Sequence, residues 1–155
     1  MVPSGELWGR KMLSGKYYHN VDEKGRLSIP AKLRNVIGES YVICNGLDGC
    51  LFVYPLVEWN KLAEQIHNAP LMDNRARLMK RHFIGSMNDG VFDKQGRVMI
   101  PGPLREVAQI DKEVVLLGTY DKVEIWSKSV YEAMLEQQMS IEDAMSGLAE
   151  AGFSF

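Results

Sequence analysis

Residues 22–34, DEKGRLSIPAKLR, return later in the same chain as residues 93–105, DKQGRVMIPGPLR. Seven of the thirteen positions are identical, whereas two unrelated segments of ordinary composition would share roughly one. The identities comprise an aspartate, a glycine and an arginine within five residues, followed by Ile-Pro and then Leu-Arg. The chain is therefore an internal duplication, and we expect each feature of the first copy to recur in the second.

The repeated segment predicts a β-hairpin whose turn carries an arginine. Residues 16–21 lead into a turn at residues 22–25, and residues 26–29 then alternate polar with apolar side chains, as a half-buried strand does. The glycine in each turn suits a position that requires positive φ. This alternation puts Leu27 toward the core, so that Arg26 points away from it.

The elements after the hairpin follow one order in both copies. Pro30 suits the first turn of a short helix that ends at Gly38. Two strands and an amphipathic helix come next, and a further helix joins the copies. We expect strands at 41–44, 50–54, 114–117 and 123–126, helices starting near Trp59, Asp73, Pro101 and Val130, and a last helix capped by Ser140 and stopped by Gly152.

A length of 155 residues fits two small units that share one core. We therefore expect an α+β fold with two tandem units. The expected organisation is an N-terminal extension over 1–15, a first repeat over 16–58, a helical linker over 59–86, a second repeat over 87–130 and an acidic helical tail over 131–155.

The composition is that of a soluble globular protein, with 46% hydrophobic and 25% charged residues. No apolar run approaches the length that crosses a bilayer, and residues 1–11 lack the long apolar stretch of a secretory signal. We therefore expect a cytosolic protein without membrane association. In that compartment Cys44 and Cys50 are expected to be free thiols.

The charge is unevenly distributed along the chain. The net charge is −2, but all 18 basic residues lie at or before Lys128, and five of the 20 acidic residues follow it. Residues 1–128 therefore carry 18 − 15 = +3. A mildly basic body with an acidic tail is compatible with a nucleic-acid partner but does not by itself indicate one.

Two arginines in turns, each four residues after an aspartate, suit DNA recognition. Arginine can bond a guanine edge through two N–H groups or hold a phosphate. The aspartate can accept bonds from backbone N–H groups of its turn, or pair with the arginine and restrict its rotamers. For one copy alone, a plain turn with a solvated arginine is the favoured interpretation. Recurrence weakens that alternative only partly, because duplication copies the fold along with any function.

The other polar groups indicate no metal-binding or catalytic site. The basic run Arg75, Arg77, Lys80 and Arg81 could follow a phosphate backbone, but a solvated or ion-paired helix face is favoured. The three histidines fall on different elements and the two cysteines lack Cys-x-x-Cys spacing, so we expect no metal and no cofactor. The carboxylate and lysine pairs of the two turns are expected to be exposed, without the desolvation that shifts a pKa. We therefore expect no enzymatic activity.

Three segments of the chain resemble those of a known protein family. Residues 20–30, 46–55 and 93–97 resemble the MraZ family of bacterial transcriptional regulators, which have two AbrB-like repeats. The likeness covers residues 12–126 and continues more loosely to residue 155. It implies two swapped-hairpin β units packed as an intramolecular pseudo-dimer with short helices. The family begins near Met12, so we interpret residues 1–11 as an extension.

The resemblance also implies a function. MraZ-like proteins assemble into homo-oligomeric rings and bind double-stranded DNA at short, evenly spaced direct repeats in the promoter of a division and cell-wall gene cluster. A cytoplasmic, nucleoid-associated protein without a small-molecule substrate is therefore expected. By motif match, the candidate DNA-binding residues are Asp22, Arg26, Asp93 and Arg97, with Lys24 and Lys94 as phosphate contacts.

Two alternatives remain open from the sequence. An AbrB-like antitoxin or other protein-interaction module would bind its partner through the acidic tail. A hydrolase that uses Asp22 or Asp93 is a distant third.

Overall fold

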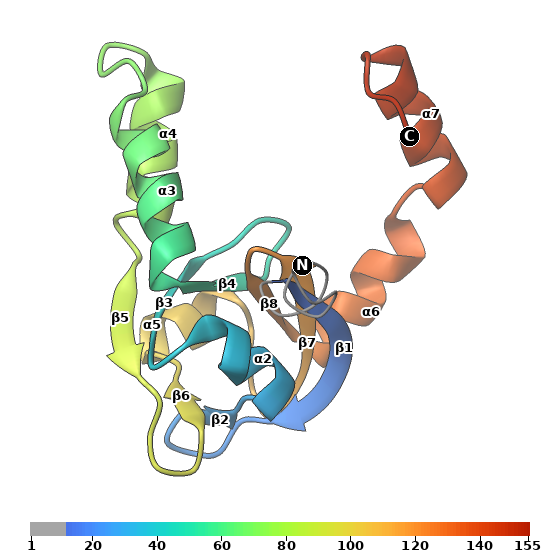
Figure 1. Ribbon diagram of the computed structural model, residues 1–155. Helices are drawn as coiled ribbons and strands as arrows, with labels where there is room; N and C mark the ends of the chain where they lie inside the picture. The colour runs from blue at the N-terminus through green and yellow to red at the C-terminus, as the bar shows by residue number, and fades with distance from the viewer. Residues whose placement is uncertain (1–11) are drawn as a thin grey trace, which may run out of the picture.

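The computed structural model describes residues 12–155, so residues 1–11 of the expected extension over residues 1–15 lie outside the described part of the chain. Helices and antiparallel strands alternate along it, which confirms the α+β class (Figure 1). The elements are β1 (Leu13–Asn20), β2 (Arg26–Ser28), α2 (Ala31–Ile37), β3 (Ser40–Asn45), β4 (Leu51–Pro55), α3 (Leu56–His67), α4 (Asn74–Phe83), β5 (Asn88–Val91), β6 (Arg97–Met99), α5 (Gly102–Val107), β7 (Glu113–Tyr120), β8 (Val123–Ser127), α6 (Lys128–Gln137) and α7 (Ile141–Glu150).

The strand order shows how the two copies combine. One sheet has the order β1-β7-β8-β4-β3-β5, and a second sheet consists of β2 and β6 alone. The first strand of the first copy, β1, pairs with β7, which is the third strand of the second copy. Likewise, the first strand of the second copy, β5, pairs with β3, the third strand of the first copy. The strands β4 and β8 pair with each other at the centre. Every sheet is therefore shared between the copies, and neither copy forms a sheet on its own.

The predicted local hairpin is wrong in its strand pairing. The turn after β1 forms as expected, but β1 pairs with β7 and β2 pairs with β6, so that β1 and β2 belong to different sheets. Alternation of side chains determines which face of a strand is buried, and it does not determine the partner strand. In a duplicated chain, the other copy offers a partner with the same pattern.

The main core lies between the two sheets. Equivalent apolar residues of the two copies belong to this one core. The predicted inward orientation of Leu27 is confirmed because its side chain is fully buried. Burial of such side chains is the dominant stabilising contribution to folding. The equivalent core pairs are Leu27 with Val98, Ile29 with Ile100, and Leu33 with Leu104.

A second core lies on the outer face of the six-stranded sheet. It also has matching parts, since Tyr54 packs on Trp59 of α3 with ring centroids 5.9 Å apart, and Trp126 packs on Tyr131 of α6 at 5.7 Å. These contacts anchor the first turns of both helices. The two cysteines lie in this core as free, buried thiols. Burial raises the pKa of Cys44 to about 12.

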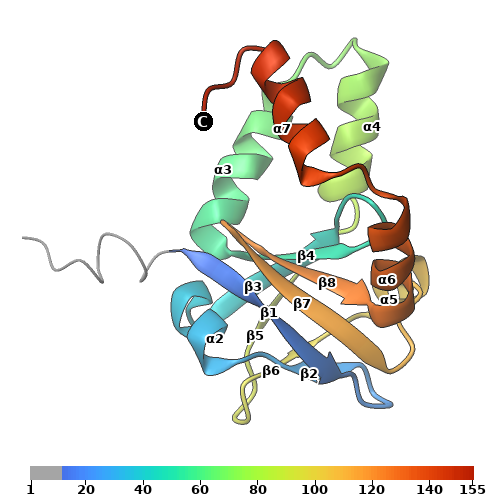
Figure 2. The ribbon, with the colours of Figure 1, turned by 90° about the vertical axis from the view of Figure 1, so that its right-hand side faces the viewer.

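Two helical arms extend from the side of the molecule opposite to the β2–β6 ribbon (Figures 1 and 2). The first arm is α3 with α4, which pack against each other, and the second arm is α6 with α7. The predicted cap of α7 is confirmed, since the Ser140 hydroxyl accepts a bond from the Asp143 N–H at 3.1 Å. None of the helices within residues 12–155 is long and apolar enough to cross a membrane.

Candidate nucleic-acid interface

The first repeated turn is organised by the carboxylate of Asp22. Its Oδ1 accepts hydrogen bonds from the backbone N–H groups of Lys24 at 2.9 Å and Arg26 at 2.8 Å. Its Oδ2 accepts from Nε of Arg26 at 2.6 Å. Gly25 completes the turn with a φ of 88° and donates its N–H to the Asp22 carbonyl. One carboxylate therefore shapes the turn and also orients the arginine.

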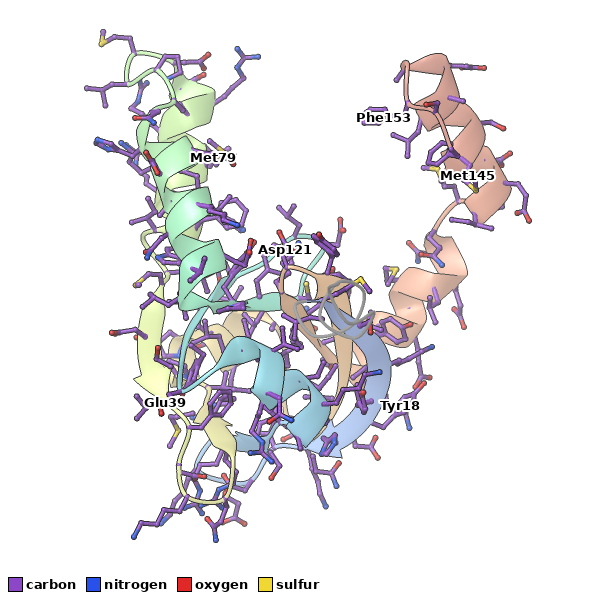
Figure 3. The ribbon with its side chains drawn as sticks, viewed as in Figure 1. Tyr18, Glu39, Met79, Asp121, Met145 and Phe153 are labelled. Atoms are coloured by element: carbon purple, nitrogen blue, oxygen red, sulfur yellow. The ribbon has the colours of Figure 1, made fainter. Side chains whose placement is uncertain are left out.

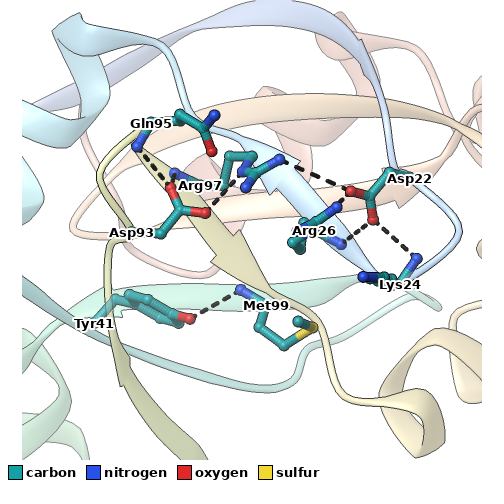
Figure 4. A network of polar contacts seen from close by, with 8 residues as sticks. All are labelled: Asp22, Lys24, Arg26, Tyr41, Asp93, Gln95, Arg97 and Met99. Atoms are coloured by element: carbon teal, nitrogen blue, oxygen red, sulfur yellow. Dashed lines mark hydrogen bonds and ion pairs between the residues drawn. The ribbon is translucent and has the colours of Figure 1, made fainter.

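The second turn repeats this geometry (Figure 4). Oδ1 of Asp93 accepts from the N–H groups of Gln95 and Arg97, both at 2.9 Å. Its Oδ2 accepts from Nε of Arg97 at 2.7 Å. Both tasks predicted for the aspartate are confirmed in both copies. We call each Asp-Arg pair a dyad.

The β2–β6 ribbon brings the two dyads together. Arg26 lies opposite Met99 and Ser28 lies opposite Arg97, so both arginines are on the outward face of one two-stranded ribbon. Nη1 of Arg97 is 4.0 Å from Oδ2 of Asp22. The two dyads therefore form one continuous group, here called the arginine cluster: Asp22, Arg26, Asp93 and Arg97.

The arginine cluster retains donors for a ligand. Each aspartate engages Nε of its arginine, which is one of the five N–H groups of a guanidinium. The side chains of Arg26 and Arg97 are 33% and 23% exposed. Each arginine is thus held through its Nε, and part of its side chain remains exposed to a ligand.

The electrostatic state of the dyads follows from the same hydrogen bonds. The pKa of Asp22 is lowered mainly by the Arg26 backbone N–H, and that of Asp93 mainly by the Arg97 backbone N–H. Both aspartates are therefore ionised at neutral pH, and the formal charges of the two dyads cancel. Positive charge comes from the exposed Lys24 and Lys94 in the same turns.

Comparison with known proteins gives a consistent family. The model of the family described as "MraZ protein, putative antitoxin-like" matches residues 12–82 and 87–150. The chain belongs to the MraZ family. A protein of Lachnoclostridium phytofermentans named "Transcriptional regulator MraZ" is 46% identical over 145 residues, which is 93% of this chain and 100% of that protein. Proteins with the same name from Halothermothrix orenii and Caldanaerobacter subterraneus are 41% and 45% identical, over 91% and 90% of this chain and 99% and 95% of their own lengths.

This MraZ-family chain has a second pair of arginines that sequence reasoning missed. Nε of Arg34 donates to the Ile29 carbonyl at 2.8 Å, and Nε of Arg105 donates to the Ile100 carbonyl at 3.1 Å. Each guanidinium then covers the turn of the other copy. A Cβ placed on Gly96 would lie 2.6 Å from Cζ of Arg34, and one placed on Gly25 would lie 2.9 Å from Cζ of Arg105.

The backbone makes the same exchange between copies. The Ile29 N–H donates to the Gly96 carbonyl at 3.1 Å, and the Ile100 N–H donates to the Gly25 carbonyl at 2.8 Å. Each turn is thus supported by the strand and helix of the opposite copy. The signal for Arg34 and Arg105 was present in the sequence, because both are among the identical positions of the repeat.

The remaining sequence candidates lie elsewhere. The basic helix α4 belongs to the first arm and is remote from the ribbon (Figure 1). Arg75 is paired with Asp73 there at 2.8 Å, as the favoured interpretation of an ion-paired face predicts. Within residues 12–155, no three His, Cys, Asp or Glu side chains gather as a metal site requires.

Proposed function

We propose that this protein is a transcriptional regulator that binds double-stranded DNA through the arginine cluster. The relatives named above carry the name of transcriptional regulators. The observation that carries the proposal is the placement of both dyads on the outward face of one two-stranded ribbon. The major groove of B-DNA is wide enough to admit such a ribbon, and it is where base pairs can be distinguished.

Each residue of the ribbon then has a role. Arg26 and Arg97 contact base edges, and their aspartates limit the rotamers that they can adopt. Lys24 and Lys94 contact phosphates on either side, because they are exposed in the turns next to the arginines. Phosphate contacts position the protein, and base contacts supply the specificity.

The proposed target is a set of short direct repeats in the promoter of a division and cell-wall gene cluster, bound by a ring of subunits. A ring built from one repeated head-to-tail contact presents the same ribbon at a regular spacing. Several ribbons can then engage successive repeats as one multivalent ligand. Multivalent binding of this kind explains how a protein with a net charge of −2 can bind DNA. Such a target places the protein on the bacterial nucleoid.

A binding titration tests the DNA contact. Arg26→Ala and Arg97→Ala are compared with the unchanged protein on a G-rich direct-repeat duplex and on a scrambled duplex. Loss of a base contact should cost about 1–3 kcal/mol on the repeat duplex and reduce discrimination, whereas loss of a phosphate contact weakens both duplexes alike and lowers the salt slope by about one.

The chain offers a matched control for this titration. Lys61→Ala removes a cation that is also held by a carboxylate, that of Glu58 at 3.2 Å, but lies on α3, away from the ribbon. Its affinity for both duplexes should equal that of the unchanged protein. If Arg26→Ala and Arg97→Ala behave like Lys61→Ala, the ribbon is not the DNA-binding surface.

The second candidate is an antitoxin or other protein-interaction module. The description of the family as antitoxin-like and the exposed, acidic α7 favour it. Deletion of residues 140–155 separates the two functions on a duplex with a single repeat, where multivalency has no part. A regulator retains this single-repeat binding after the deletion, whereas an antitoxin loses its toxin.

A further inference from the structure

The last helix, α7, presents an apolar stripe that no other part of residues 12–155 covers. Ile141, Met145 and Leu148 follow the i, i+4, i+7 spacing of one helix face, and all three are exposed. No residue of α7 is buried. Figure 1 shows α7 standing apart from the first arm, and Figure 3 shows Met145 on this isolated helix. A stripe of this kind is typical of a helix that packs against a partner.

The charge of α7 narrows the choice of partner. The helix contains Glu142, Asp143 and Glu150 and no basic residue. Glu142 is three positions before Met145, so it borders the apolar stripe. Two copies of α7 packed together would bring like charges into contact, which is unfavourable. The partner of α7 should therefore be apolar at its centre and basic at its edge.

The helix α4 has these properties. It carries Arg75, Arg77, Lys80 and Arg81 and no acidic residue. Leu78 is 67% exposed, and the exposed Arg81 follows it by three positions on the same face. The exposed Leu71 and Met72 extend the apolar area in the loop before the helix. Because Arg75 is already paired with Asp73, Arg81 is the stronger candidate for an ion pair with α7.

We propose that α7 of one subunit packs on α4 of a second copy, with Met145 against Leu78 and Glu142 near Arg81. The contact is heterologous because it joins two different surfaces. Each subunit keeps one free α4 and one free α7 after the first contact, so that assembly continues until a ring closes. This inference rests on the proposed ring and names the two surfaces that build it.

Both arms lie on the side opposite to the β2–β6 ribbon (Figures 1 and 2). A contact between arms therefore leaves the arginine cluster uncovered in every subunit. Assembly and DNA contact can then be separated by mutation.

Complementation between two variants tests the contact. Leu78→Asp disables α4 and Met145→Asp disables α7, and each variant alone should sediment as a monomer. Mixed together, they retain one intact α7 and one intact α4 between them. The mixture should therefore form a one-to-one dimer and stop there. Sedimentation velocity measures these masses, and far-UV circular dichroism verifies that both variants are folded.

Two control variants introduce an aspartate at exposed positions outside the proposed contact. Ser146→Asp lies on α7 away from the apolar stripe, and Gln65→Asp lies exposed on α3. Both should assemble like the unchanged protein. The proposal is overturned if either variant of the pair keeps the mass of the unchanged protein, or if their mixture contains only monomers.

The outcomes also distinguish this inference from the proposed function. An unchanged protein that is a monomer removes both the ring and this contact. A large oligomer that survives Met145→Asp leaves the ring in place and assigns it to other surfaces. Loss of DNA binding in Arg26→Ala at an unchanged mass supports the ribbon and has no bearing on α7.

Discussion

Nη1 of Arg97 lies 4.0 Å from Oδ2 of Asp22, across the β2–β6 ribbon. The same Oδ2 accepts from Nε of Arg26 at 2.6 Å. A carboxylate of the first copy therefore lies beside the arginines of both copies, whereas Asp93 is bonded to Arg97 of its own turn. The two dyads are therefore similar but not equivalent in their contacts, and Asp22 is the carboxylate that lies near both arginines.

Replacing this carboxylate should alter both arginines. In Asp22→Asn, the amide oxygen can still accept from the turn, but the charge that holds Arg26 and attracts Arg97 is lost. Removal of a negative charge also favours DNA of any sequence. We expect binding to scrambled duplex to strengthen and discrimination for the repeat duplex to fall, by about 1 kcal/mol or more.

The matching variant Asp93→Asn provides the control. Asp93→Asn removes a carboxylate that is bonded to the arginine of its own dyad only. Discrimination between the repeat and scrambled duplexes should therefore fall less than in Asp22→Asn. Fluorescence anisotropy with both duplexes at one salt concentration measures the two ratios. Equal effects of the two variants would contradict a coupling role for Asp22.

The lowered pKa values of Asp22 and Asp93 predict a pH dependence of stability. A carboxyl whose folded-state pKa lies below its ordinary value of 3.8 stabilises the fold above that value. This stabilisation is lost as the pH falls through the lower folded-state pKa. Urea unfolding from pH 6 to pH 2 should therefore show a free energy of unfolding that decreases below about pH 4. This decrease should be smaller in an Asp22→Asn, Asp93→Asn double variant.

Asp73 is an independent reference for this measurement. Its pKa is also lowered, chiefly by the Arg75 side chain, but it lies on the first arm. The variant Asp73→Asn should leave the contribution of the ribbon intact. Identical acid profiles for the double variant and the unchanged protein would show that the ribbon carboxylates do not contribute.

The parts of this structure that depend on local pattern were predictable from the sequence. Alternation along residues 26–29 placed Leu27 inside and Arg26 outside, because burial of a strand residue depends on its own face. Helix boundaries such as Gly38 and Ser140 were predictable because caps act through nearby backbone groups. The Asp-x-x-x-Arg turn was recognisable because its hydrogen bonds join residues at most four apart.

The pairing of strands between the copies was not predictable in this way. A local hairpin and an exchange between copies bury the same alternating residues, so the pattern fits both. The merger of the dyads on one ribbon follows from that exchange. The role of Arg34 was hidden for the same reason, since its guanidinium covers Gly96 of the other copy. Repetition of the arginine indicated a shared role without revealing which turn it supports.

The glycine of each turn should be difficult to replace. Gly96 has a φ of 74°, and an added Cβ would meet the Arg34 guanidinium at 2.6 Å. Gly96→Ala therefore combines an unfavourable backbone conformation with a displaced arginine. We expect a loss of about 1–3 kcal/mol in the free energy of unfolding, with Tm lower by roughly 2–4 °C per kcal/mol.

Gly147→Ala is the comparison for this variant. Gly147 lies within α7, and an added Cβ would meet nothing within 4 Å. Alanine is the better helix former, so this substitution should leave Tm unchanged or slightly raised. Differential scanning calorimetry measures the Tm of both variants. A Gly96→Ala protein as stable as Gly147→Ala would refute the close packing against Arg34.

Arg34 and Arg105 should act on the turn of the opposite copy. Arg34→Met keeps most of the apolar stem but removes the donor to the Ile29 carbonyl and the cover over Gly96. We expect the free energy of unfolding to fall by about 1–3 kcal/mol. Faster amide exchange should appear at Gln95 and Arg97, because the Asp93 turn loses its support.

The reciprocal variant makes this prediction specific. Arg105→Met should speed exchange at Lys24 and Arg26 and leave Gln95 and Arg97 unaffected, because Arg105 covers Gly25. Lys32→Met changes an exposed cation on the same helix as Arg34 and should affect neither turn. Hydrogen exchange followed by NMR resolves these amides individually. Exchange that rises in the same copy as the substitution would show that each arginine supports its own turn, and a rise in both turns would point to general loosening of the fold.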